Sequence, residues 1–379
     1  MRTFYELRNI PVHSVLLMPT RERAVNYPRR DLRLGFCPVC GFVGNTLFDP
    51  SVHEYSTSCE ESQGFSPTFN AFARSLAQRW VETYQLRGKS ILEIGCGKGE
   101  FLVSMVELGM ARGIGIDPAF VPERLTTPTA SRLEFIQDLY SEKYAHLQAD
   151  VICCRHTLEH IAPTARFLRM LRRTIGDRRD TLLLFELPDA FRVLKEPAFW
   201  DIYYEHCSYF TTGSLARLFR QSGFDLHELE LEYDNQYIVI AATPATVPVT
   251  ALLPGEDDLE ATAAEVAGFP VRFATLKRHW LSTIESIRAD GRKLVIWGGG
   301  SKAVSFLTTL GLTDQIDFVV DINPYKHGKF IPGTGHEVRS PEALKQHRPD
   351  CVILMNPIYV CEVRGMLAQM GLHPEIFPV

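Results

Sequence analysis

Long apolar runs and an excess of basic residues are both missing from this sequence. The chain has 379 residues, of which 45% are hydrophobic and 22% charged, and its formal net charge is −5 at pH 7. A membrane-spanning helix requires about 20 consecutive apolar residues, and a surface for nucleic acid or anionic lipid would be basic. We therefore expect no membrane segment and no nucleic-acid partner, and we look for a small-molecule substrate instead.

Cysteines with a repeating spacing and a secretory leader are also missing. The nine cysteines are odd in number, and the first residues, MRTFYELRNIPVHSVLLMPTRERA, contain only a short apolar patch before charged residues return. This pattern indicates free thiols in a reducing compartment, so we expect a cytoplasmic protein. Its oligomeric state stays open between a monomer and a homodimer.

The sequence pattern divides the chain into three domains, at residues 1–70, 71–245 and 246–379. The first is rich in Pro, Arg, Tyr and Ser, whereas the second alternates predicted strands and helices. The segment TPATVPVTALLPGEDD is typical of a linker, and a further strand–glycine–helix unit follows it. The alternation predicts the α/β class with a doubly wound parallel sheet. The late segment LHELELEYDNQYIVIAATP predicts a hairpin added to that sheet. We expect a small irregular N-terminal domain before it and a second, smaller α/β domain after it.

The segment ILEIGCGKGEFL carries the sharpest local motif. Gly95, Gly97 and Gly99 separate an apolar strand from an amphipathic helix, and glycine lets the backbone turn tightly beside a ligand. Asp117 ends the next predicted strand, where a carboxylate can hold ribose hydroxyls, and Asp138 ends the third, where it can take an adenine amino group. The spacing differs from the G-x-G-x-x-G of dinucleotide binders. An NAD(P) site and a glycine turn without a ligand are the alternatives.

The segment DIYYEHCSYF, residues 201–210, follows a predicted strand and is expected at the carboxyl edge of the sheet, where such folds bind ligands. His206 can remove a proton near neutral pH, the adjacent Glu205 can orient it, and Tyr203 can donate to an oxygen that gains charge. This set suits proton abstraction beside a carbonyl group and equally suits deprotonation of a hydroxyl group. A hydrogen-bonded cluster without chemistry is the alternative.

A second glycine loop, WGGGSKAVSF, opens a strand–loop–helix unit in the C-terminal domain. Gly298, Gly300 and Ala303 fit G-x-G-x-x-A, and Asp321 follows at the distance of a ribose-binding acid. The loop could cradle the phosphates of a nucleotide-linked substrate, belong to an NAD(P)-linked oxidoreductase domain, or be a structural remnant. For the favoured phosphate cradle, the expected substrate-binding residues are Gly298, Gly300, Ser301, Lys302 and Lys326.

The first loop resembles the E/D-x-G-x-G-x-G motif of class I S-adenosylmethionine-dependent methyltransferases, which have a Rossmann-like fold. The matching positions are Glu93, Gly95, Gly97, Gly99 and Asp117. ADVICCRHTLEHI is similar to that family's fourth motif, which runs beside the methionine part of the cofactor, so His156 is expected at its border. The resemblance implies S-adenosyl-L-methionine as the cofactor.

IYYEHCSYFT resembles the Y-x-E-H-x-S-Y-F segment of bacterial sugar-nucleotide C-methyltransferases, which make C-methylated deoxysugars for natural products. The resemblance covers nearly the whole chain. It implies a zinc-binding N-terminal domain, a central methyltransferase domain and a C-terminal Rossmann-like domain that helps to hold the nucleotide-sugar. It also implies that His206 is the general base and that Tyr203 and Glu205 line the acceptor carbonyl. His160 is expected to face the same pocket, and Tyr55 is the nearest match to a tyrosine that completes it.

The N-terminal domain departs from the family pattern. The family uses two C-x-x-C pairs for zinc, and this sequence supplies only Cys37 and Cys40. Two thiolates do not complete a tetrahedral zinc site, and no spacing argues for His13, His53 or Cys59 as substitutes. We therefore expect a metal-free remnant, with zinc at the two cysteines as the alternative.

The expected function is methylation of a carbon atom next to a ketone in a nucleotide-linked deoxysugar, by base-assisted enolate formation and methyl transfer. The missing cysteine pair keeps open an O- or N-methyltransferase that acts on another small-molecule natural product. A non-catalytic binding protein is a third hypothesis, against which the intact glycines and the Tyr-Glu-His set argue. The sequence does not identify the sugar or the nucleotide.

Overall fold

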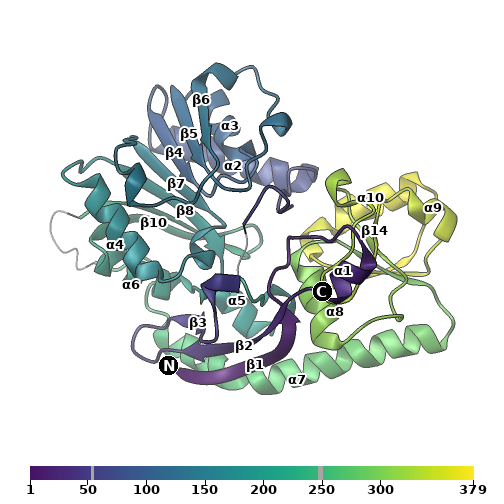
Figure 1. Cartoon of the computed structure of the whole chain (residues 1–379). Helices are drawn as coiled ribbons and strands as arrows, with labels where there is room; N and C mark the ends of the chain where they lie inside the picture. The colour runs from purple at the N-terminus through teal and green to yellow at the C-terminus, as the bar shows by residue number, and fades with distance from the viewer. Residues whose placement is uncertain (53–54, 246–250) are drawn as a thin grey trace.

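The computed structural model of the chain describes residues 1–52, 55–245 and 251–379. Two α/β lobes lie beside each other, and a sheet built mainly by N-terminal residues lies at their base in Figure 1. None of the helices within these residues is long and apolar enough to cross a membrane.

The N-terminal residues are more regular than the sequence indicated. β1 (Arg2–Pro11), β2 (Arg29–Phe36) and β3 (Val43–Asn45) form an antiparallel sheet, and the short helix α1 (Arg21–Val25) lies between the first two strands in the sequence. The fourth strand, β9 (Ser208–Tyr209), comes from the segment that contains His206. The candidate catalytic segment is therefore paired with the N-terminal sheet through β9.

The central lobe is a seven-stranded sheet in the order β10-β11-β8-β7-β4-β5-β6. The five strands from β8 to β6 are parallel, and β10 and β11 add the expected antiparallel hairpin at one edge. β7 is buried on both faces and is therefore continuously apolar before its final arginine. The strands are β4 (Ser90–Ile94), β5 (Arg112–Ile116), β6 (Leu133–Ile136), β7 (Val151–Arg155), β8 (Leu182–Pro188), β10 (Phe224–Glu232) and β11 (Tyr237–Pro244).

Helices cover both faces of this sheet. α2 (Pro67–Thr83) begins where the Ser66 hydroxyl accepts a hydrogen bond from the Phe69 N–H, and it buries Leu76 and Trp80 as its period predicts. α2 and α3 pack on one face, and α4 and α6 pack on the other. The remaining helices of the lobe are α3 (Glu100–Glu107), α4 (Thr164–Ile175), α5 (Ala190–Lys195) and α6 (Thr212–Gln221).

The C-terminal lobe is a smaller doubly wound sheet, as expected, with five parallel strands in the order β14-β13-β12-β15-β16. Its strands are β12 (Leu294–Trp297), β13 (Val319–Val320), β14 (Val338–Arg339), β15 (Cys351–Leu354) and β16 (Glu375–Pro378). Its helices are α8 (Ser301–Leu310), α9 (Ala343–His347) and α10 (Val360–Gln369).

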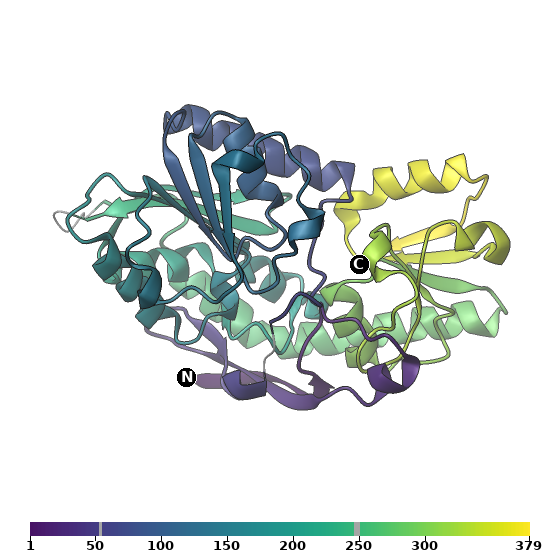
Figure 2. The same ribbon diagram turned by 45° about the horizontal axis from the view of Figure 1, so that its top comes forward.

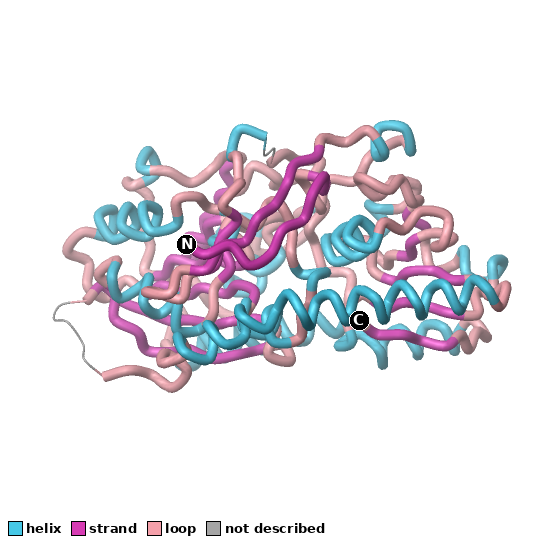
Figure 3. Tube along the Cα trace, turned by 90° about the horizontal axis from the view of Figure 1, so that it is seen from below, coloured by secondary structure: helices cyan, strands magenta, loops and turns pink. Residues whose placement is uncertain are grey.

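The long helix α7 (Leu259–Ala289) joins the N-terminal sheet to the C-terminal lobe and is seen along its length in Figure 3. Phe269 packs edge-on against Tyr5 of β1 at a centroid distance of 5.1 Å, and Trp280 packs against Phe306 of α8 at 5.2 Å. One helix thus supports two apolar cores.

Residues 59–66 pass between the two lobes, as Figure 2 shows. The Lys98 Nζ of the first glycine loop donates to the Cys59 carbonyl at 2.9 Å, and Asn323 Nδ2 of the C-terminal lobe donates to Glu60 Oε1 at 2.8 Å. This segment therefore contacts both lobes at the place where their glycine loops open.

Candidate active site

A cavity of about 1280 Å³ lies where the three parts of the chain meet. It is lined by both glycine loops, by residues 60–66 and by the Tyr-Glu-His segment. All the predicted catalytic, cofactor-binding and substrate-binding residues line it except Gly99. These are His206, Glu205, Tyr203, His160, Glu93, Gly95, Gly97, Asp117, Asp138, His156, Tyr55, Gly298, Gly300, Ser301, Lys302 and Lys326.

The first glycine loop connects β4 to α3 and needs glycine for steric reasons. Gly95 has φ +72°, and a Cβ there would lie 2.0 Å from the Thr157 hydroxyl. Gly97 also has a positive φ, and its N–H donates to Asp117 Oδ2 at 2.8 Å. Gly99 caps α3, and a Cβ there would strike the Phe135 ring at 2.7 Å, so this glycine allows close packing rather than access to the cavity.

The loop is surrounded by carboxylates. Glu93 is 2% exposed, and its Oε2 has no hydrogen-bond partner within the described residues. Burial raises its pKa to about 8, and burial also raises the pKa of Asp117. A ligand that brings a positive charge beside these groups would favour their ionised forms. The residues therefore fit S-adenosylmethionine, whose amino-acid end carries an ammonium group.

Asp138 and His156 border the cavity but already have partners. Asp138 accepts from the Tyr144 hydroxyl at 2.5 Å and pairs with Lys143, whose ammonium helps to hold the aspartate pKa at about 2. His156 Nε2 lies 3.1 Å from Glu186 Oε1. The adenine contact of Asp138 and the methionine-side role of His156 stay predictions.

The Tyr-Glu-His segment is buried between the central lobe and the N-terminal sheet. Glu205 Oε1 accepts from the Ser14 N–H at 2.9 Å and also from the Ser14 hydroxyl. Burial raises the pKa of Glu205 to about 7. Tyr203 donates to Asp201 Oδ1 at 2.9 Å. Glu205 is thus held by the N-terminal residues, and the Tyr203 hydroxyl is held by the residue two positions before it.

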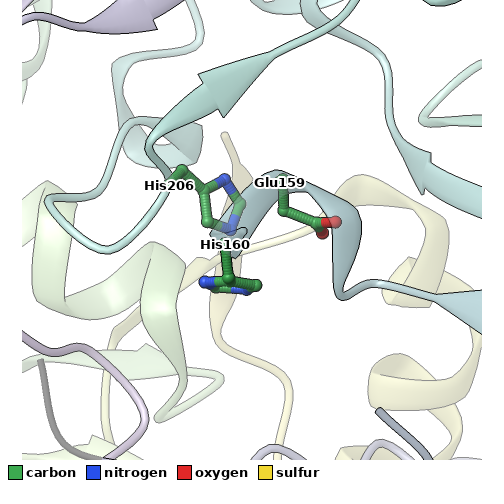
Figure 4. Close-up of side chains that lie close together, drawn as sticks. All are labelled: Glu159, His160 and His206. Atoms are coloured by element: carbon green, nitrogen blue, oxygen red, sulfur yellow. The ribbon is translucent and has the colours of Figure 1, made fainter. Parts of the chain in front are cut away.

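Three side chains converge at the centre of the cavity wall, as Figure 4 shows. His160 and His206 have ring centroids 4.7 Å apart, and potential donor or acceptor atoms of Glu159, His160 and His206 all lie within 4.8 Å of one another. Tyr55 packs edge-on against His160 at 5.7 Å, and Tyr203 against His206 at 4.7 Å. The structure thus brings together the four predicted aromatic and imidazole side chains. It adds Glu159, which the sequence suggested only by its position next to His160 in LEHI.

The second glycine loop connects β12 to α8 and is surrounded by cations. The Gly299 N–H donates to Asp321 Oδ2 at 2.7 Å, and Lys326 Nζ lies 3.1 Å from the same oxygen. Lys302 forms an ion pair with Asp201 across the two lobes, and Arg192 of α5 donates to Asp201 Oδ2 at 2.5 Å. Arg192 and Asp201 both line the cavity. No motif pointed to Arg192, and Asp201 was only the first residue of the segment DIYYEHCSYF.

Cys37 and Cys40 do not line the cavity. Within the described residues they belong to no group of three or more histidine, cysteine or carboxylate side chains close enough to hold a metal ion. Of the substitutes, Cys59 Sγ lies 3.9 Å from His13 Nε2, and His53 lies outside the described residues. Zinc binding therefore stays an untested alternative.

Comparison with known proteins decides the class of this chain. Residues 69–229 match a methyltransferase domain, and residues 237–372 match a C-methyltransferase C-terminal domain. The C-methyltransferase NovU of Streptomyces niveus is 28% identical over 309 residues, which are 76% of this chain and 72% of that protein. The chain belongs to the S-adenosylmethionine-dependent C-methyltransferases. The predicted class I fold, enzyme class and cofactor are thereby confirmed.

Two further similarities each cover less than half of this chain. The ribosomal protein L11 methyltransferase of Yersinia pestis is 27% identical over 106 residues, 27% of this chain and 36% of that protein. The solved 1,6-didemethyltoxoflavin-N1-methyltransferase of Burkholderia thailandensis covers 47% of this chain and 81% of its own, with 18% identity and a TM-score of 0.37. Similarities of this size say nothing about the substrate of this C-methyltransferase.

Proposed function

We propose that this C-methyltransferase methylates a carbon atom next to a ketone in a nucleotide-linked deoxysugar, as a tailoring step for a natural product. The observation that carries the proposal is that one cavity joins the acid-lined first glycine loop, the cation-lined second loop and the two histidines between them. A substrate with a phosphate-bearing end and a reacting sugar end matches this order of groups.

On one side of the cavity, Gly95 and Gly97 leave room for the amino-acid end of the cofactor, and Glu93 and Asp117 supply negative charge. Bound S-adenosylmethionine would supply an electrophilic methyl group on a sulfonium sulfur. The protein's part is to hold the accepting carbon against that methyl group, since correct placement of two reactants contributes much of a transfer rate.

At the centre, His206 would remove a proton from the carbon next to the ketone. The C–H bond breaks, an N–H bond forms on the imidazole, and the electron pair moves toward the carbonyl oxygen to give an enolate. Tyr203 and Tyr55 border this position. Burial raises the pKa of both phenols, so both remain protonated. Tyr55 can donate a hydrogen bond to the developing oxyanion, and Tyr203 can do so once its hydroxyl turns from Asp201 to the substrate.

On the other side, Lys302, Lys326 and Arg192 would hold the diphosphate. Each of these cations has a carboxylate neighbour, Asp201 or Asp321, which holds its side chain in the cavity wall. The amides of the second loop add donors at the start of α8.

The test is to identify the methylated atom. The enzyme is incubated with S-adenosylmethionine labelled with ¹³C in the methyl group and with a panel of nucleotide-linked ketosugars, and the products are analysed by NMR. The proposal expects the label on a carbon next to the ketone, with coupling to the ring carbon. A label on oxygen or nitrogen would replace it with the O- or N-methyltransferase alternative.

A further inference from the structure

We propose that Glu159 is a positioning residue that stabilises His206 when the imidazole carries the proton taken from the substrate. The inference rests on the proposed role of His206 as the base. A carboxylate oxygen of Glu159 lies within 4.8 Å of nitrogen atoms of both His206 and His160. At this distance a carboxylate favours the charged form of an imidazole.

Burial and a missing hydrogen bond make Glu159 available for this role. It is 3% exposed, and its Oε2 has no hydrogen-bond partner in the part of the chain that the structure describes. It lies at the cavity wall in the one-turn helix η5 (Leu158–His160), which fixes it beside the histidines. A buried carboxylate without a partner is costly unless a positive charge forms next to it.

The adjacent Glu205 is less suited, although its place in the sequence suggests it. Its Oε1 accepts two hydrogen bonds from Ser14, and its backbone carbonyl faces His160 Nδ1 at 3.2 Å. Its Oε2 also has no hydrogen-bond partner within the described residues, but Glu205 is not part of the group of atoms within 4.8 Å that Glu159 forms with the two histidines. Glu205 therefore ties the catalytic loop to the N-terminal residues, and its contribution to His206 is mainly structural.

The other charged groups around Glu159 do not replace the histidines as its partner. Arg155 and His156 both pair with Glu186, at 2.6 and 3.1 Å, so this trio is internally compensated. The remaining titratable groups that face the cluster are Tyr55, Cys154, Asp201, Tyr203, Glu205, Cys207 and Tyr209. The pKa values of the phenols and thiols among them are raised by burial, so these groups are neutral near pH 7. Asp201 is neutralised by Lys302 and Arg192.

Burial raises the pKa of Glu159 to about 7. The carboxyl group thus changes its protonation state easily at the pH where the enzyme works. When His206 accepts a proton, the new positive charge favours ionised Glu159. Two adjacent buried groups then carry opposite charges, and any proton that Glu159 gives up passes to solvent. The pair relaxes when the imidazole returns its own proton to solvent.

The test measures His206 directly in the enzyme without substrate. Side-chain NMR titration of ¹⁵N-labelled histidine resolves the 12 histidines, and His206→Asn assigns the signal. Glu159→Gln should make His206 titrate about one pH unit lower than in the unchanged enzyme, and Glu159→Asp should have a smaller effect. Glu205→Gln should shift the His206 titration less than Glu159→Gln does. An unchanged titration in Glu159→Gln, with thermal unfolding and S-adenosylhomocysteine affinity preserved, would overturn the proposal.

Kinetics supply a second readout. In Glu159→Gln the acidic limb of the pH profile of kcat/KM should move to lower pH. The value of kcat should fall roughly tenfold, which is less than the loss expected when a general base is removed. If His206→Asn stays active while Glu159→Gln still shifts the His206 titration, the proposed base is wrong but the pairing of Glu159 with His206 holds. If Glu205→Gln shifts the limb and Glu159→Gln does not, the pairing is refuted.

Discussion

The two glycine loops of this enzyme share a backbone design. Each follows the first strand of a doubly wound sheet, and in each a loop N–H donates to the carboxylate that ends the neighbouring strand. In the first loop Gly97 donates to Asp117 at 2.8 Å, and in the second Gly299 donates to Asp321 at 2.7 Å. The backbone alone therefore does not tell the two ligands apart.

The side chains around the loops differ in charge. Near the first loop the one lysine of the motif, Lys98, is occupied by the Cys59 and Ala119 carbonyls and by Glu61, while Glu93 Oε2 has no hydrogen-bond partner among the described residues. Near the second loop, Lys302 and Lys326 lie at the cavity wall. We infer that glycines provide close approach and that the surrounding charge selects a cationic cofactor on one side and phosphates on the other.

The largest expected effect lies between the loops. His206→Asn should lower turnover by roughly 10²–10⁴-fold, the usual worth of a positioned base. It should leave S-adenosylhomocysteine affinity unchanged, because His206 belongs to neither loop. Turnover is measured with the identified acceptor and affinity by calorimetry. Near-normal turnover would make His160 the next candidate.

The loops should differ in their tolerance of a methyl group. Gly95→Ala combines a positive φ with a 2.0 Å contact, so it should lose about 2–4 kcal/mol, divided between folding stability and cofactor affinity. Gly300→Ala is the matched control, because its φ is −107° and its Cβ would meet only Lys326 Nζ at 3.8 Å. Its free energy of unfolding should change by less than about 0.5 kcal/mol. Equal losses of stability in both variants would contradict the inference that glycine is needed at position 95 for steric reasons.

Charge changes should separate the two ligands. Lys302→Met should raise the KM for the nucleotide-sugar by roughly 10–100-fold, since a hydrogen bond to a charged group contributes about 1.5–3 kcal/mol, and should leave S-adenosylhomocysteine affinity unaltered. Asp117→Ala should do the reverse, weakening S-adenosylhomocysteine by about 1–3 kcal/mol. Isothermal calorimetry with each ligand checks both. If either variant weakens the binding of both ligands equally, charge does not determine which loop binds which ligand.

The smallest effect is a pH dependence of the first loop. The Glu93 pKa of about 8 lies above its unfolded value, so the stability that its protonated form contributes is lost as pH rises through about 8. The ammonium group at the amino-acid end of S-adenosylhomocysteine favours ionised Glu93, so the affinity for this ligand should rise with pH, by at most about tenfold per unit. Thermal shifts with and without ligand between pH 6 and 8.5 measure this. Glu93→Gln should flatten the dependence, and an unchanged dependence in that variant would assign it to another group.

Local patterns were enough to predict both glycine loops, the parallel strands and the β10–β11 hairpin. Glycine spacing and apolar periodicity are properties of neighbouring residues, and the loops followed from them. The N-terminal sheet was not anticipated, because its last strand, Ser208–Tyr209, lies more than 160 residues beyond β3 and is too short to show a period.

The same reason explains what the sequence missed at the site. Arg192 lies in no recognised motif, and Asp201 and Glu159 lie in quoted segments without an assigned role. Each gains its role only when the fold brings another lobe or loop beside it. The histidines were predicted from a resemblance, and their 4.7 Å approach comes from η5 and the loop before β9. Chemistry that depends on contacts between lobes is therefore visible only in three dimensions.

Solvent exchange tests the central claim, that His206 creates an enolate between the two loops. The enzyme is held in D₂O with a nucleotide-linked ketosugar and S-adenosylhomocysteine, so that no methyl group is transferred, and the sugar is followed by NMR. With the unchanged enzyme, deuterium should replace a proton on the carbon next to the ketone. With His206→Asn, this exchange should not occur. Exchange that persists undiminished in His206→Asn, or a complete lack of exchange with a sugar that the enzyme does methylate, would contradict the account.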